Sequence, residues 1–183
     1  MLLQRFISYY SCGKGGQRKI MRVQDMTVTA LLAALIAVSG SLKLPGILPG
    51  TEFQLSAPLA VAVCAVYGFR RYFLAGVLAS LAMLLLGTQT IFNTTIALLF
   101  RLTVGAVLAL GGTSFITVAI AGPIASFAAR LTLMLVIGQA AWAVVFAAVP
   151  GMVYTAIAAW PLTLLLRRVR RETERAYEHV IQR

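Results

Sequence analysis

Apolar residues fill most of the chain in long stretches, and short segments rich in glycine, proline, threonine or arginine separate them. A helix that crosses the ~30 Å hydrocarbon core of a bilayer needs about 20 mostly apolar residues, and somewhat shorter helices are tolerated. The pattern therefore predicts an all-α polytopic membrane protein, a bundle of six transmembrane helices. The predicted helices cover residues 27–44, 53–67, 72–86, 94–110, 115–148 and 150–166.

Proline and glycine pairs punctuate the last two of these predicted helices. The fifth is long enough to be tilted, or bent at Gly122-Pro123, and Pro150-Gly151 is expected to start the sixth. Proline lacks the amide hydrogen that a helix interior needs, so it favours helix starts and kinks.

Basic residues flank the apolar region. Five precede the first predicted helix, six follow the last, and Arg70 and Arg71 lie together between the second and third. The connections on the other side, over about 45–52, 87–93 and 149–151, contain no lysine or arginine. Cytoplasmic loops carry the excess of Lys and Arg, and an even number of spans returns the chain to its starting side. Both termini are therefore predicted to lie in the cytoplasm.

The composition narrows the function classes. Hydrophobic residues make up 60% of the chain and charged residues 11%, and the mean hydropathy is +0.89. The net charge of +11 is dispersed at helix ends, whereas a nucleic-acid-binding protein gathers such charge on one soluble face. The single histidine, His179, lies in the C-terminal tail, no CxxC occurs, and Glu52 is the one acidic residue between Asp25 and Glu172. A metal cluster of usual spacing and a membrane-embedded enzyme are therefore disfavoured.

The chain divides into three parts. Residues 1–21 form a basic N-terminal tail, 22–171 the six-helix membrane domain, and 172–183 a cytoplasmic C-terminal tail. Residues 14–16 (Lys-Gly-Gly) are a sequence that a purine-rich ribosome-binding site would encode, a few codons before Met21. Two interpretations stay open: translation that starts at Met21, and a genuine N-terminal tail.

Polar residues cluster at the predicted outer side of the bundle. Arg101 lies seven residues inside the fourth predicted helix, about 10 Å deep at 1.5 Å per residue, on one face with Thr94 and Ala97. Small-molecule sites combine apolar walls with a few polar anchors, so this end is a candidate binding pocket. The candidate substrate-binding residues are Glu52, Gln54, Gln89, Asn93, Arg101, Gln139 and Trp142.

Two roles for Arg101 remain open at this point. It lines a pocket open to the outside, or it serves as a structural ion-pair partner of Glu52. Gln139 and Trp142, three residues apart in the outer half of the fifth predicted helix, would present an amide and an aromatic wall together.

The first predicted helix carries small residues at fourfold spacing. Ala30 and Ala34 form one pair, and Ala33 and Ala37 overlap it. Such spacing lets two helix backbones approach closely. Prolines and glycines between positions 45 and 50 then break the helix and lead into an arching loop.

Together these features resemble the substrate-binding S component of an energy-coupling factor (ECF) type vitamin transporter. The resemblance rests on the size, the six predicted spans, the first helix TALLAALIAVSG with its Pro/Gly-rich loop, and the segment PGMVYTAIAAWPLTLLLRRVRR, and it covers about residues 22–171. It implies a multi-pass protein of the bacterial plasma membrane that captures a vitamin or similar small molecule from outside. No one vitamin's fingerprint is visible, so the substrate stays open, although a cationic Arg101 would favour a carboxylate or phosphate.

The resemblance also implies partners. The small residues of the first helix would contact a transmembrane coupling subunit: Ala30 and Ala34, with the overlapping Ala33 and Ala37. The first outer loop, from about Pro45 to Glu52, would cover the substrate. The chain has no Walker motif, so separate ATPase subunits would hydrolyse ATP and the chain itself would hold no cofactor. The alternative is a non-transporting structural or assembly subunit of a membrane complex, whose small-residue faces only hold partners together.

Overall fold

The computed structural model describes residues 23–41, 43–45, 52–54, 56–137 and 141–181. Over these residues the chain is helical apart from two three-residue strands and the short turns between helices. Three helical segments are long and apolar enough to cross a membrane: Ile91–Gly111, Phe115–Thr132 and Ala148–Thr173. The prediction of an all-α multi-pass membrane protein is confirmed. The helices are α2 (Val23–Ser41), α3 (Ser56–Tyr67), α4 (Phe69–Leu85), α5 (Ile91–Gly111), α6 (Phe115–Ile137) and α7 (Ala141–Ile181).

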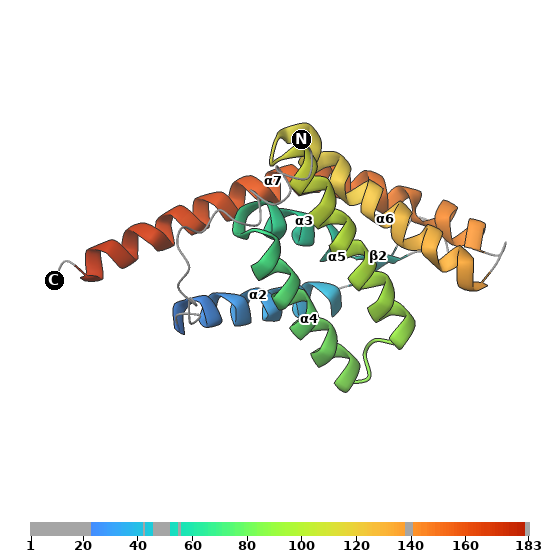
Figure 1. Ribbon diagram of the computed structural model, residues 1–183, viewed down its shortest axis with the longest axis horizontal. Coiled ribbons are helices and arrows are strands. Elements are labelled where there is room, and N and C mark those ends of the chain that lie inside the picture. Colours follow the sequence, from blue (N-terminus) through green and yellow to red (C-terminus); the bar gives the residue numbers. More distant parts are fainter. Residues whose placement is uncertain (1–22, 42, 46–51, 55, 138–140, 182–183) are drawn as a thin grey trace.

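The short helix α3 lies at the centre of the bundle. Eight of its 12 residues are buried, because α3 is apolar on every side and so can be covered all round. Helices α6 and α7 run side by side past it, α2 packs across α4, and α4 and α5 form a hairpin (Figure 1). The C-terminal part of α7 extends beyond the other helices (Figure 1).

The boundary between the last two predicted helices was wrong. The structure ends α6 at Ile137 rather than at residue 148, and α7 begins at Ala141, so Pro150 lies inside α7 instead of at its start. Pro123 and Pro161 likewise lie within continuous helices. Apolar membrane helices tolerate an internal proline because the neighbouring helix and local hydrogen bonds compensate for the lost one. Contrary to the prediction from the sequence, Pro150 therefore does not mark the start of a helix in this chain.

The connection between the first two predicted helices contains a short β-hairpin that the sequence did not predict. Strands β1 (Lys43–Pro45) and β2 (Glu52–Gln54) pair antiparallel, with Leu44 opposite Phe53. Consequently α2 ends at Ser41 and α3 begins at Ser56, inside the predicted limits of the first two spans. Strand pairing supplies the backbone hydrogen bonds that a non-helical segment at a bundle surface needs.

Gly68 alone joins α3 to α4. Its φ of 83° lies in the region that residues with a side chain rarely adopt, so a glycine permits this abrupt reversal. Arg70 and Arg71 thus fall in the first turn of α4 rather than in a loop.

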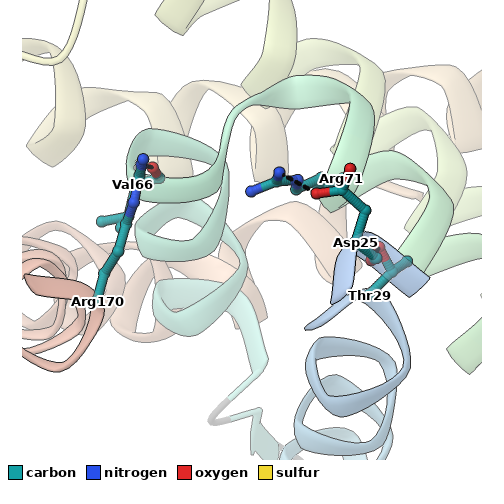
Figure 2. Close-up of polar contacts among 5 residues, drawn as sticks. All are labelled: Asp25, Thr29, Val66, Arg71 and Arg170. Atoms are coloured by element: carbon teal, nitrogen blue, oxygen red, sulfur yellow. Dashed lines mark hydrogen bonds and ion pairs between the residues drawn. The ribbon is translucent and has the colours of Figure 1, made fainter. Parts of the chain in front are cut away.

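Arginine side chains form polar contacts between helix ends on one side of the bundle. Arg71 forms an ion pair with Asp25 in the first turn of α2 (Figure 2). Arg170 of α7 donates a hydrogen bond of 2.7 Å to the carbonyl oxygen of Val66 in α3 (Figure 2). These contacts join the start of α2, the α3–α4 joint and the basic part of α7.

A third contact adds the turn between α5 and α6 to the same side. Arg167 donates a 3.2 Å hydrogen bond to the carbonyl oxygen of Thr113, and its guanidinium carbon lies 5.6 Å from the ring centroid of Trp160. Trp160 packs edge-on against Phe115 of α6, with ring centroids 5.1 Å apart. The helix ends that the sequence assigns to the cytoplasmic side therefore lie together.

Candidate functional site

Arg101 lies in the middle of α5, at the contact with α4. Ten residues of α5 precede it, so it is deeper than the sequence-based boundary suggested. Only 6% of the residue is exposed, and its Nη1 donates a 2.9 Å hydrogen bond to Oγ of the buried Ser80 on α4. Among the described side chains, no carboxylate lies within ion-pair distance of this guanidinium. A cation is therefore buried with a neutral partner.

Gly76 makes room for this arrangement. A Cβ placed on Gly76 would overlap Nε of Arg101 and lie 2.6 Å from its Cδ. Ser80 is four residues further along α4, on the same face, so the arginine side chain runs along α4 from Gly76 to Ser80. The two small residues together position the guanidinium.

Tyr72 belongs to the same face of α4, one turn before Gly76. Its ring is fully buried, and its hydroxyl has no hydrogen-bond partner among the described residues. The sequence analysis did not identify Tyr72, Gly76 or Ser80. The spacing of Gly76 and Ser80 is the small-xxx-small pattern recognised in the first helix, and the same signal was available here.

Two further polar atoms are buried at the α4–α5 turn. The side-chain oxygen of Gln89 and the hydroxyl of Thr94 are shielded from solvent and have no hydrogen-bond partner in the described part of the chain. Thr94 and Arg101 lie on the same side of α5, two turns apart. Asn93 differs from them: it is exposed, and its backbone amide donates to the hydroxyl of Thr90, which caps α5.

The other candidate binding residues stay outside this cluster or outside the described structure. Glu52 and Gln54 lie on β2, where their backbones pair with Pro45 and Lys43, and their side chains are not described. Gln139 lies outside the described residues. Trp142 is in the first turn of α7, and its predicted pairing with Gln139 lies outside the described residues.

The four alanines of the first helix divide between two faces of α2. Ala30 and Ala34 are exposed, in a strip with other exposed apolar residues, whereas Ala33 and Ala37 are half-buried and pack against the bundle core. The exposed strip comprises Ala30, Leu31, Ala34, Leu35 and Val38. The outward pair is therefore the one available to another helix.

An apolar depression lies on the outer surface of α6. Its volume is about 410 Å³, and Phe127, Ala128, Leu131 and Thr132 line it. It lies away from the α4–α5 contact and has no charged lining residue, so it does not share the chemistry of the Arg101 cluster.

Comparison with known proteins gives one informative relative. The chain is 47% identical over 148 residues to Protein BioX of Lysinibacillus sphaericus, an alignment that covers 81% of this chain and 89% of the relative. No family model and no solved structure matches the chain.

Proposed function

Because the chain belongs to the family of Protein BioX, we propose that it is the substrate-capture (S) subunit of an ATP-driven importer of the ECF type, and not an enzyme. The relative's name points to biotin, so the substrate proposed here is a biotin-related small molecule that carries a carboxylate. The resemblance to S components in helix number, helix pattern and first outer loop supports the same proposal.

The buried charge of Arg101 is the observation that carries this proposal. A cation inside a membrane bundle is costly, and such residues mark substrate or ion pathways by default. Within the described residues Arg101 has a serine hydroxyl as its side-chain partner and no counter-ion. A substrate carboxylate would supply the missing charge, and a guanidinium can hold a carboxylate by two parallel hydrogen bonds.

The other predicted binding residues, together with Thr94, would form a pocket around Arg101. Gln89 and Thr94 contribute buried polar atoms beside the α4–α5 turn. Glu52, Gln54, Asn93, Gln139 and Trp142 would line or close the outer side of the site.

The proposed partners are a transmembrane coupling subunit and ATPase subunits. The exposed strip of α2 that contains Ala30 and Ala34 is the proposed contact with the coupling subunit, since small residues allow close helix approach. The sequence has no Walker motif, so the ATPases would be separate chains. Residues 22–171 form the proposed membrane domain.

Both termini are proposed to face the cytoplasm. The side of the bundle joined by Arg71, Arg167 and Arg170 also carries the exposed Arg70, Arg168 and Arg171, as the positive-inside rule requires of a cytoplasmic surface. A membrane-impermeant maleimide should label Arg168→Cys in inverted but not in right-side-out vesicles, and the reverse result would contradict this orientation.

Uptake into proteoliposomes tests the proposal. Labelled biotin should accumulate only when the chain, its coupling subunit, the ATPases and ATP are all present, and a Walker-lysine variant of the ATPase should abolish accumulation. Accumulation by the chain alone would identify a stand-alone carrier instead.

A structural or assembly subunit is the competing function, because the exposed alanine strip of α2 would serve it equally well. Such a subunit has no use for a buried arginine that lacks a carboxylate partner among the described side chains. Stabilisation of the purified chain by a small molecule separates the two, since only a binding subunit is stabilised by a ligand.

A further inference from the structure

Thr94 differs from the other helical threonines of this chain. In seven of them the hydroxyl donates to the carbonyl oxygen four residues earlier, at 2.6 to 3.0 Å: Thr29, Thr95, Thr103, Thr132, Thr155, Thr163 and Thr173. The corresponding carbonyl of Thr90 is available to Thr94, yet the hydroxyl of Thr94 is buried with no partner in the described structure. Its local bond is therefore not made, although the helix offers it.

Gln89 has the same unsatisfied state at the same end of the hairpin. It directly precedes Thr90, the N-cap of α5, and its buried side-chain oxygen has no partner among the described residues. Buried polar groups are nearly always hydrogen-bonded, so two orphaned groups at one turn require an explanation. A ligand that supplies both bonds is such an explanation.

The distance from this turn to Arg101 sets a length. Seven residues separate Thr94 from Arg101, which is about 10 Å along the helix at 1.5 Å per residue. The arginine side chain reaches to Ser80, in the half of α4 that leads to the same turn, so the guanidinium lies nearer to Thr94 than this rise. A charged group and a neutral polar pair thus lie along one side of α5, with about 10 Å as the upper limit of their separation along the helix.

We propose that the α4–α5 hairpin binds a carboxylate ligand at two poles. The guanidinium of Arg101 holds the carboxylate, and the side chains of Thr94 and Gln89 hold a second hydrogen-bonding group of the same ligand, less than about 10 Å away along the helix. This inference rests on the proposed function and adds to it the second polar group of the substrate.

The second pole is uncharged, which defines its chemistry. The unpaired atom of Gln89 is its side-chain oxygen, which only accepts hydrogen bonds, whereas the hydroxyl of Thr94 can donate or accept. A cyclic urea has N–H donors and a carbonyl oxygen and can pair with both groups, but an ionised carboxylate can pair with the hydroxyl alone. An aliphatic tail would fill the length but leave both groups unpaired, so a simple fatty acid should bind poorly.

Three ligands of similar length test the two poles on the purified full-length chain by calorimetry. Biotin carries a carboxylate and a cyclic urea, the nine-carbon straight-chain dicarboxylate azelate carries two carboxylates, and nonanoate carries one carboxylate and an apolar tail. Biotin should bind at least tenfold more tightly than nonanoate, and also more tightly than azelate, because the second carboxylate of azelate cannot donate to the side-chain oxygen of Gln89. Equal binding of nonanoate would overturn the inference.

Thr94→Val provides the matched variant, with Thr95→Val as its control because the Thr95 hydroxyl is exposed and bonded to Ile91. Thr94→Val should weaken the two-pole ligand about tenfold and leave nonanoate unchanged, and Gln89→Leu should do the same. Without ligand, Thr94→Val should unfold at no lower temperature than the wild type, since it removes an unpaired buried hydroxyl.

The outcomes separate this inference from the proposed function. If the wild type binds biotin or azelate but Thr94→Val, Gln89→Leu and Thr95→Val all bind it equally well, the second pole is wrong and the proposed function stands. If the wild type binds no carboxylate, both are overturned.

Discussion

The guanidinium of Arg101 on α5 donates a 2.9 Å hydrogen bond to the hydroxyl of Ser80 on α4. Both residues are buried, and the side chain reaches Ser80 by passing over Gly76. The guanidinium of Arg101 is thus positioned by the hydroxyl of Ser80 and by the space that Gly76 leaves beside it. Among the described side chains, this charge has no carboxylate partner.

Gly76→Ala should displace Arg101. The new Cβ would overlap Nε, and overpacking of this kind costs about 1–3 kcal/mol. Ligand affinity should fall at least tenfold, as measured by calorimetry, and the unfolding temperature should also fall.

Gly40→Ala is the matched control for that variant. Gly40 is also helical, and a Cβ there would meet Met83 at an ordinary distance of 3.6 Å. It should keep wild-type affinity. Should Gly76→Ala bind as tightly as Gly40→Ala, the position of Arg101 would not matter for binding.

Asp25→Asn should loosen the contact between α2 and α4. The charge-assisted hydrogen bond from Arg71 is partly shielded, with 38% of the arginine and 28% of the aspartate side chain exposed. Its loss should cost about 1 kcal/mol. Thermal unfolding of the detergent-purified chain measures this.

Glu172→Gln is the control for the ion pair, because Arg175 and Glu172 are 71% and 63% exposed. It should change stability by less than about 0.5 kcal/mol. A double-mutant cycle with Arg71→Gln isolates the pair, and a coupling energy near zero would contradict the structural role of the Asp25–Arg71 contact.

Ala30→Leu and Ala34→Leu should prevent close approach of another helix to α2. Both alanines are exposed, so the bundle itself should tolerate the larger side chain. Co-purification with the coupling and ATPase subunits should decrease about tenfold while ligand binding is unchanged.

Ala82→Leu supplies the control for these variants, since Ala82 is exposed on α4. It should co-purify normally. Normal co-purification of both α2 variants would show that the coupling subunit, if present, binds elsewhere.

The hydrophobic pattern predicted the number of helices because each apolar stretch ends at a polar, glycine-rich or arginine-rich segment. It did not predict their lengths, which range from 12 residues in α3 to 41 in α7. The pattern failed where its signal was ambiguous. Pro150 interrupts the sequence but not the helix α7, and the strands at Lys43–Pro45 and Glu52–Gln54 are too short to show a periodicity.

The site was predicted only in part, because some of its residues are recognisable only from how the helices pack. Arg101 and Gln89 were recognisable as polar residues in an apolar setting. Ser80 and Gly76 are ordinary small residues whose role depends on the register between α4 and α5, and that register is a property of packing. Small-xxx-small spacing was the one available signal, and it occurs in most membrane helices.

Thermal unfolding of the full-length chain and of Arg101→Ala, with and without biotin and a panel of water-soluble vitamins and their precursors, tests the central claim most directly. A carboxylate-bearing compound should stabilise the wild type saturably, by about 2.7 kcal/mol at a hundred times its dissociation constant, and should leave Arg101→Ala unaffected. An equal stabilisation of the variant would remove Arg101 from the binding site. No stabilisation by any compound would contradict a substrate-capture function and favour an assembly subunit.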